Sequence, residues 1–401
     1  MRARMDYGPL AGRVELKQVR DILTQSFEFP ISQFEMWLNA VGREQIRRIT
    51  RSDRVIAALA FVRMGQWFGR RAVPMVGIAA VGVPPEDRAS GAAFHLMSES
   101  LKELRAEGTP ISTLYPATQR LYRKVGYEQA GFRCRHSVPT RSIPRFPREL
   151  PCRRIDGSKT DAFHKPYDLL AERNSGMLHR NQAMWQRVVT VHGSPVYGYL
   201  FGTAKEPEGY VVFTQEKLPE GYDLHLRDLV AVTPRAARAV WTFLSDHRSL
   251  AKNVHWLGPA AEPLLGLLPE QDACILSSER WFLRIVDVAA ALEARGYPED
   301  VEATITIEIE DEILPENRGR WVLHVADGRG RVERPRRARA ASAKGGEKLL
   351  RLHIRSLAPL YSGLFTPRQS ASLGWIDAAP DALSAAAAIF AGPEPWMPDA
   401  F

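Results

Sequence analysis

One stretch of the sequence combines a strand, a turn and the start of a helix in an order that suits phosphate binding. The apolar run 79–83 predicts a strand, and a helix is expected from Ser90 to Glu107. Arg88 and Gly91 fall in the turn between them. The first N–H groups of a helix are unpaired and carry partial positive charge, so they bind phosphates, and glycine lets the backbone approach closely. An ordinary strand-to-helix turn is the alternative interpretation.

Two motifs in this region resemble the GNAT acetyltransferases. The spacing Arg88-x-x-Gly91-x-Ala93 is similar to their acyl-CoA pyrophosphate loop, and the run 121–128, Leu-Tyr-Arg-Lys-Val-Gly-Tyr-Glu, is similar to their helix and tight turn beside CoA. The resemblance implies that Tyr127 is the general acid. A tyrosine of pKa ~10 can protonate a thiolate (pKa ~8.5) as it forms. A core aromatic is the alternative for Tyr127, and Tyr122 is a rival for the role.

The elements that must position these residues divide the chain into three expected domains, 1–140, 152–284 and 285–401. The first mixes helical patterns with apolar strands and is typical of an α/β domain. Four prolines between 139 and 151 end regular structure and mark a boundary. The second domain repeats the order strand, helix, strand around a helix predicted at 234–246. It has no glycine-rich loop before that helix, so we expect no cofactor site there.

The third domain is expected to combine a helix at 287–295 with strands at 303–309 and 321–325. Helices at 354–361 and 382–390 follow, and the chain ends in the apolar, proline-rich run 393–401. This composition is too apolar for a solvated tail, so we expect the end of the chain to be tucked into the protein. The predicted fold class is therefore α/β (α+β) throughout.

Composition excludes several classes of protein. Apolar residues make up 45% of the 401 and charged residues 25%, as in ordinary globular domains. Three dispersed cysteines cannot form a disulfide framework or a four-ligand zinc site, so no metal is expected. No apolar run reaches the ~18 residues of a membrane span, and no signal peptide is visible, so the expected location is cytoplasmic.

The net charge of +8 is concentrated in six arginines between 329 and 339. No aromatic residue lies among them to stack on bases, so no nucleic-acid partner is expected and a solvated hairpin tip is the favoured interpretation. Contact with a polyanion is the alternative.

The whole chain resembles the Eis (enhanced intracellular survival) family. Besides 81–93 and 121–127, the resemblance rests on Trp281–Val288, Leu292–Pro298 and the Asp, Pro-x-Asn and Gly-x-Trp pattern of 311–321. The family has an N-terminal GNAT domain, a second GNAT-like domain and a C-terminal domain like sterol carrier proteins. The resemblance implies an N-acetyltransferase that uses acetyl-CoA and assembles as a homohexamer.

The resemblance also assigns site residues. The acetyl-CoA contacts are Val81, Gly82, Val83, Arg88, Ala89, Ser90, Gly91, Ala92, Ala93, Phe94, Tyr122 and Arg123. The family uses its own C-terminal carboxylate as catalytic base, which here is Phe401. An α-carboxylate of pKa ~3.5 is a weak base in water but can take a proton from an ammonium group when both are desolvated.

The sequence leaves the acceptor amine open. Aminoglycosides, polyamines, peptide lysines and other small amines all fit an N-acetyltransferase. The residues 25–28 retain only Glu28 as an acid, and Ala400 precedes Phe401, so the expected pocket is less anionic than one built for multiply cationic substrates. A lipid- or sterol-binding protein with a non-catalytic acetyltransferase fold is the alternative function.

Overall fold

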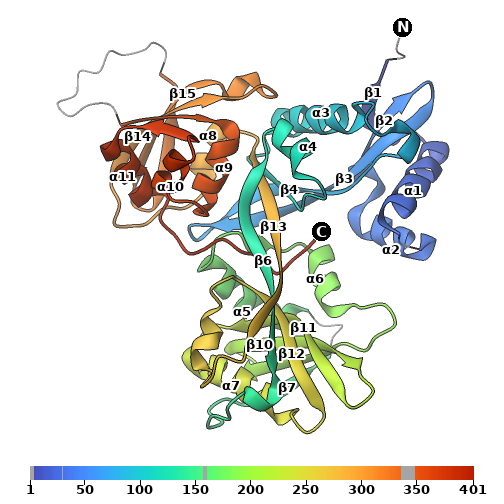
Figure 1. The fold of residues 1–401 in the computed structure, drawn as a ribbon, viewed down its shortest axis with the longest axis vertical. Helices are drawn as coiled ribbons and strands as arrows, with labels where there is room; N and C mark the ends of the chain where they lie inside the picture. Colours follow the sequence, from blue (N-terminus) through green and yellow to red (C-terminus); the bar gives the residue numbers. More distant parts are fainter. Residues whose placement is uncertain (1–3, 29, 157–159, 336–347) are drawn as a thin grey trace.

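The computed structural model describes residues 4–28, 30–156, 160–335 and 348–401, which form two β-sheets covered by helices (Figure 1). Within these ranges the larger sheet has thirteen strands, and its order is β1-β2-β3-β4-β5-β13-β6-β12-β11-β10-β9-β7, with β8 paired to β3. The smaller sheet has the order β16-β15-β14-β17-β18. This mixed architecture is the fold class that the sequence predicts.

Residues 4–139, called the first unit here, supply one end of the large sheet. Their elements are β1 (Asp6–Pro9), α1 (Arg13–Phe27), α2 (Ile31–Val41), β2 (Ile46–Arg51), β3 (Arg54–Phe68), β4 (Arg71–Gly82), α3 (Ala92–Ala106), β5 (Ile111–Leu114), α4 (Gln119–Lys124) and β6 (Glu128–Pro139). Alternate residues of β3 face opposite sides, so Ala58 and Ala60 pack with α1 while Leu59 and Phe61 pack with α3. Helices therefore cover both faces of this part of the sheet.

Strand β2 was not expected, because its sequence, Ile-Arg-Arg-Ile-Thr-Arg, contains three arginines. Two of them are nevertheless buried. The Arg47 guanidinium binds Glu103 of α3 at 2.6 Å, and Arg48 binds Glu15 of α1 at 3.1 Å. Partners on neighbouring helices thus allow charged residues inside a central strand, a condition that strand patterns cannot reveal.

Residues 152–285, the second unit, supply the other end. Their elements are β7 (Cys152–Ile155), α5 (Asp161–Glu172), β8 (Leu178–His179), α6 (Gln182–Val189), β9 (Tyr197–Gly202), β10 (Pro207–Lys217), β11 (Tyr222–Ala231), α7 (Pro234–Asp246), β12 (Ala251–Gly258) and β13 (Cys274–Ile285). Helix α7 begins at Pro234, and the Thr233 hydroxyl accepts a hydrogen bond from the Ala236 N–H. The succession β11–α7–β12 repeats β4–α3–β5, and both strand pairs are parallel.

Two long antiparallel strands, β6 and β13, connect the two units and run side by side through the centre of Figure 1. One end of β13 pairs with β5 of the first unit, from Phe282 to Ile285. One end of β6 pairs with β12 of the second unit, from Cys134 to Pro139. The sheet is therefore continuous across the proline-rich link.

Residues 288–390, the third unit, contain the smaller sheet. Their elements are α8 (Val288–Ala294), β14 (Ala303–Glu310), β15 (Gly319–Ala326), β16 (Arg329–Glu333), β17 (Leu349–His353), α9 (Ile354–Ser362), α10 (Pro367–Ser372), β18 (Ile376–Ala378) and α11 (Pro380–Ile389). Apolar side chains of β14, β15 and β17 join those of α8, α9 and α11 in one buried core. Among the described residues no helix has the length and apolar character needed to cross a membrane.

The last residues of the chain leave the third unit and return to the junction of the other two (Figure 1). The Trp396 N–H donates to the Ser175 carbonyl at 3.0 Å, and the Phe132 N–H donates to the Pro395 carbonyl at 3.2 Å. The terminal segment is thus held by β6 and by the loop before β8, as its apolar composition predicts.

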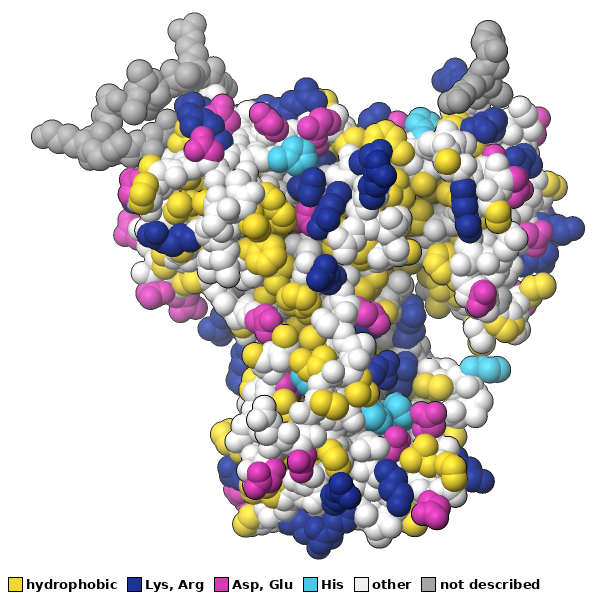
Figure 2. All heavy atoms as spheres, viewed as in Figure 1, with side chains coloured by type: hydrophobic (Ala, Val, Ile, Leu, Met, Phe, Trp, Pro, Cys, Tyr) yellow, Lys and Arg dark blue, Asp and Glu magenta, His cyan; other side chains and the backbone are white. Residues whose placement is uncertain are grey.

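The arginine cluster lies only partly within the described residues. Arg331 pairs with Glu333 at 3.1 Å, and Arg334 stacks over the Trp321 ring and donates to the Arg318 carbonyl. Arg336, Arg337 and Arg339 lie outside the described residues. On the face shown in Figure 2, basic and acidic side chains are interspersed over all three units.

Candidate active site

The site begins at an irregularity near the end of β4. Ala80 has a φ of 53°, in the left-handed region, and the pairing with β3 shifts register between Ala58 and Ala60. This is a β-bulge, which bends a strand and turns its following residues toward a new direction. A left-handed conformation costs an alanine about 1–2 kcal/mol, so the surrounding structure holds strain here, as is common at functional sites.

A cavity of about 720 Å³ lies beside the bulge. It is lined by Ser26, Phe27, Val81, Val83, Asp87, Arg88, Ala89, Gly91, Ala92, Ala93, Phe94, Ala117, Thr118, Leu121 and Tyr122. The cavity thus lies between the C-terminal end of α1, the loop that enters α3, and α4. Its volume is typical of sites for small organic ligands.

The loop that enters α3 presents its backbone to this cavity. Gly91 is the N-cap of α3 with a φ of 89°, and no side chain caps the helix. A Cβ at Gly91 would meet nothing within 4 Å, so glycine is needed for its backbone conformation and not to avoid crowding. The N–H groups at the start of α3 and the exposed Arg88 together provide positive charge at one wall.

Three of the predicted cofactor residues do not line this cavity. Gly82 faces α1, where a Cβ would stand 2.8 Å from a Leu23 methyl carbon. The Ser90 hydroxyl accepts from the Ala92 N–H at 3.4 Å. The Arg123 guanidinium is paired with buried Glu128 at 2.7 Å. Their contacts are thus to the protein itself.

Tyr127 lies in the core, behind Tyr122, which lines the cavity. Its ring is fully buried and meets the Tyr122 ring edge-on at 6.2 Å. Its hydroxyl lies 2.8 Å from the Ser112 hydroxyl oxygen, which donates its own proton to the Val76 carbonyl. Tyr127 is therefore the donor to Ser112. Burial raises the pKa of Tyr127 above its ordinary value of 10.0, so the hydroxyl is protonated at neutral pH.

Phe401 lies at the point where β4 and β5 part. The two strands pair in parallel from Met75 and Ile111 to Gly77 and Thr113. A Cβ on Gly77 would stand 2.5 Å from the Phe401 ring, so the ring occupies the space that a side chain would fill. The Phe401 and Tyr115 rings meet edge-on at 6.1 Å.

Tyr127 and Phe401 reach this strand pair from opposite sides. Ser112, the partner of Tyr127, is registered with Val76, the neighbour of Gly77. Successive residues of a strand face opposite sides of the sheet. The phenolic hydroxyl and the Phe401 ring therefore lie on opposite faces of the β4–β5 pair, at adjacent residues of β4.

A buried arginine fixes the segment that carries Phe401. Arg180, at the end of β8, binds both carboxylate oxygens of Asp399 at 3.0 Å and also contacts Asp228. Its guanidinium stacks on the Tyr167 ring at 3.9 Å. Burial raises the pKa of Asp399, and the charge of Arg180 opposes that shift. The Tyr115 hydroxyl adds a hydrogen bond to the Asp399 carbonyl at 2.7 Å.

Sequence reasoning missed Arg180, Asp228 and the bulge at Ala80. The Asp399 carboxylate is engaged by Arg180. No local signal identifies these contacts, because Arg180 and Asp399 are far apart in the sequence. The bulge also has no glycine to mark it.

The chain is similar to known acetyltransferases. Two models described as acetyltransferase (GNAT) domains match residues 10–130 and 176–285, and a sterol carrier protein domain model matches 288–398. An uncharacterized N-acetyltransferase of Streptomyces avermitilis is 27% identical over 83% of each chain. The N-acetyltransferase Eis of Mycobacterium tuberculosis is 27% identical over 66% of each chain.

Among solved structures, a GCN5-related N-acetyltransferase from Anabaena variabilis superposes with a TM-score of 0.93. It is 42% identical, and the match covers 99% of this chain and 100% of that one. The likeness therefore extends over all three units.

Proposed function

The chain belongs to the Eis-like family of GCN5-related N-acetyltransferases with a C-terminal sterol carrier protein domain, and from this membership we propose a direct acetyl transfer. In this proposal the protein moves the acetyl group of acetyl-CoA to an acceptor amine. Tyr127 is the acid and the Phe401 carboxylate is the base.

The cavity beside α3 supports acetyl-CoA as the co-substrate. The N–H groups at the start of α3 and the Arg88 side chain suit a pyrophosphate. The backbone of Val81 and Val83 follows the bulge and suits the pantetheine amides. The apolar wall at Tyr122 leads from there toward Tyr127.

The two proton transfers have separate groups in this proposal. The Phe401 carboxylate accepts the proton that the attacking amine loses. The Tyr127 hydroxyl, which is protonated at neutral pH, donates its proton to the departing CoA thiolate. At neutral pH the α-carboxylate is ionised and the phenol is protonated, so each group is already in the form that its transfer needs.

The observation that carries this proposal is the fixing of the terminal segment by Arg180. An unattached terminus would sample many positions, and positioning a reacting group is worth several kcal/mol of a reaction barrier. Here Asp399 is held two residues before Phe401, whose ring lies against Gly77. Such restraint is expected of a terminus that takes part in catalysis.

A one-residue extension of the C-terminus tests the role of Phe401. A single alanine added after Phe401 should lower turnover by about 10²-fold or more, because the carboxylate moves by one residue, while acetyl-CoA affinity stays unchanged. Thiol release reports turnover, and calorimetry reports binding. Unchanged turnover would show that the base lies elsewhere, and loss of acetyl-CoA binding would show that the extension disturbs the cavity.

The acceptor is proposed to be a small amine of low positive charge. Asp399 is the acid nearest the end of the chain, and Arg180 already compensates its charge. A multiply cationic aminoglycoside or polyamine therefore gains less binding free energy near Asp399 than a monoamine or a lysine side chain does. Comparing kcat/KM over a panel of these amines at two salt concentrations checks the ranking, and a clear preference for polycations would contradict it.

For the third unit, we propose that it supports the terminal segment instead of carrying lipid. Its apolar sheet face is occupied by side chains of α8, α9 and α11. Extraction of purified protein with organic solvent, followed by mass spectrometry, should release no stoichiometric lipid. The homohexamer implied by the family is a separate proposal that light scattering checks.

A further inference from the structure

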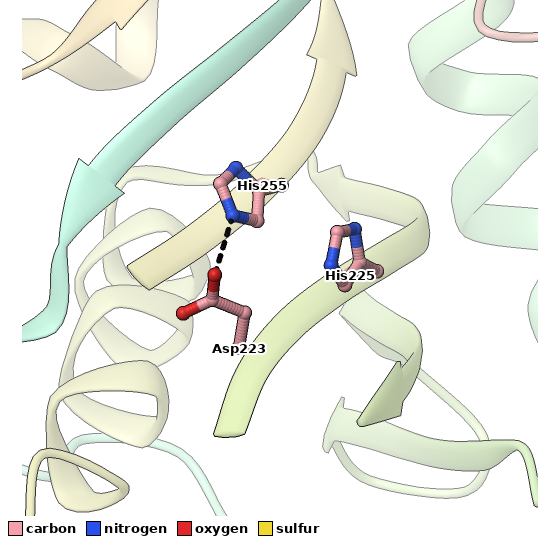
Figure 3. A group of neighbouring side chains, drawn as sticks. All are labelled: Asp223, His225 and His255. Atoms are coloured by element: carbon pink, nitrogen blue, oxygen red, sulfur yellow. Dashed lines mark hydrogen bonds and ion pairs between the residues drawn. The ribbon is translucent and has the colours of Figure 1, made fainter. Parts of the chain in front are cut away.

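Three side chains that commonly ligate metals converge in the second unit (Figure 3). Asp223 and His225 are two residues apart on β11 and therefore lie on one face of the sheet. His255 of β12 is the register partner of His225. One ligand atom from each residue lies within 4.8 Å of the others, and all three residues are half-buried.

The trio occupies a distinctive place in the fold. The pair His225–His255 is the last in parallel register between β11 and β12. The pair Gly77–Thr113 has the same position between β4 and β5, where the Phe401 ring lies in the first unit. The second unit thus places imidazoles at the counterpart of the proposed acetyl-transfer centre.

Neighbouring groups contact two of the three side chains. One carboxylate oxygen of Asp223 accepts from the Asn253 N–H at 2.9 Å and from its amide nitrogen at 3.1 Å. Glu216 of β10 lies 2.7 Å from Nε2 of His225. A carboxylate oxygen this close to an imidazole nitrogen is placed to share a cation with it.

The protein alone leaves part of the trio unsatisfied. Nε2 of His225 is buried and makes no hydrogen bond among the described residues, although a Glu216 oxygen lies 2.7 Å away. The two imidazole rings stack with their centres 4.7 Å apart.

We propose that Asp223, His225 and His255 bind one divalent cation of the zinc class. Two imidazoles and a carboxylate are ligands that Zn²⁺ and its neighbours in the first transition row prefer over Mg²⁺ or Ca²⁺. Bonds of about 2.1 Å hold tetrahedral ligand atoms roughly 3.4 Å apart, so small side-chain rotations complete the site. Water or Glu216 fills the fourth position, and the ion ties β11 to β12.

Metal titration of the full-length, untagged protein tests the proposal. After removal of metal with a chelator, Co²⁺ should bind at one ion per chain and give the visible absorption of a tetrahedral site, and Zn²⁺ should displace it. The variants Asp223→Asn and His255→Gln should each weaken binding by more than about tenfold. The exposed His192 offers a matched control, and His192→Gln should bind as the wild type does.

A second measurement separates loss of the site from loss of the fold. Excess Zn²⁺ should raise the thermal unfolding midpoint of the wild type, because it binds the native state, and should not raise that of Asp223→Asn, which keeps the side-chain shape. Substoichiometric binding by the wild type would overturn the proposal. Equal binding by folded Asp223→Asn and wild type would also overturn it.

Discussion

Nε of Arg180 lies 3.0 Å from each carboxylate oxygen of Asp399, and this contact joins the second unit to the segment that ends at Phe401. Both side chains are almost completely buried, and Asp228 contacts the other side of the same guanidinium. A buried charge without a partner is costly. The position of the terminal segment is therefore tied to the folding of the second unit.

The variant Asp399→Asn should release that segment. We expect kcat to fall by about 10- to 100-fold because the terminus loses its fixed position, while the KM for acetyl-CoA is unchanged. Arg180 keeps Asp228 as a partner, so the variant should fold. Steady-state kinetics are the measurement. The control is Asp377→Asn, which removes an exposed ion pair with Arg351 in the third unit, and an equal loss in both variants would refute this role.

Tyr127→Phe should lower kcat by about 10²–10⁴-fold, the usual contribution of a general acid. Loss of the hydrogen bond to Ser112 should cost only about 1 kcal/mol of unfolding free energy. Because burial raises the pKa of Tyr127 above 10.0, wild-type kcat should show no loss from tyrosine ionisation below that pH. A pH–rate profile checks this, and wild-type activity in the Phe variant would assign the acid elsewhere.

Gly77→Ala should displace the Phe401 ring, since the new Cβ would stand 2.5 Å from it. Overpacking of this kind costs about 1–3 kcal/mol, and the displaced terminus should lower kcat. Acetyl-CoA affinity measured by calorimetry should persist. Gly266→Ala provides the control because a Cβ there meets nothing within 4 Å. Full activity in Gly77→Ala would show that the ring position is unimportant.

Ala80→Gly should leave stability unchanged or raise it by up to about 1 kcal/mol, because glycine adopts the left-handed region without strain. The neighbouring Ala79→Gly should instead destabilise by about 0.5–1 kcal/mol, since Ala79 is an ordinary buried strand residue. Urea unfolding of both variants measures the contrast. Similar destabilisation of the two would argue against strain at the bulge.

The sequence was informative where periodicity and local chemistry act together. The helix of α3, the strand β4 and the N-cap at Thr233 follow from apolar spacing and capping residues. Strand β2 was not predicted, because the charges of Arg47 and Arg48 are neutralised by partners on helices. Composition cannot show such compensation.

The site was partly predictable for a similar reason. Residues of the loop before α3 are consecutive in the sequence, so a short motif can identify them. Most of them line the cavity. The Arg180–Asp399 contact joins residues that only the tertiary fold brings together. The expectation about metals considered only the cysteines, and His255 joins Asp223 and His225 only through the pairing of β11 with β12.

The insertion of β13 between β5 and β6 bears on how this chain acquires its structure. Until residues 282–285 have been synthesised, β5 has an open edge. Strand β6 lacks both of its neighbours until residues 251–258 supply β12. Unpaired strand edges promote aggregation, and pairing over long sequence separations is slow. A truncated chain of the first 140 residues should therefore be insoluble when expressed alone, and the two acetyltransferase-like units should unfold in a single cooperative transition.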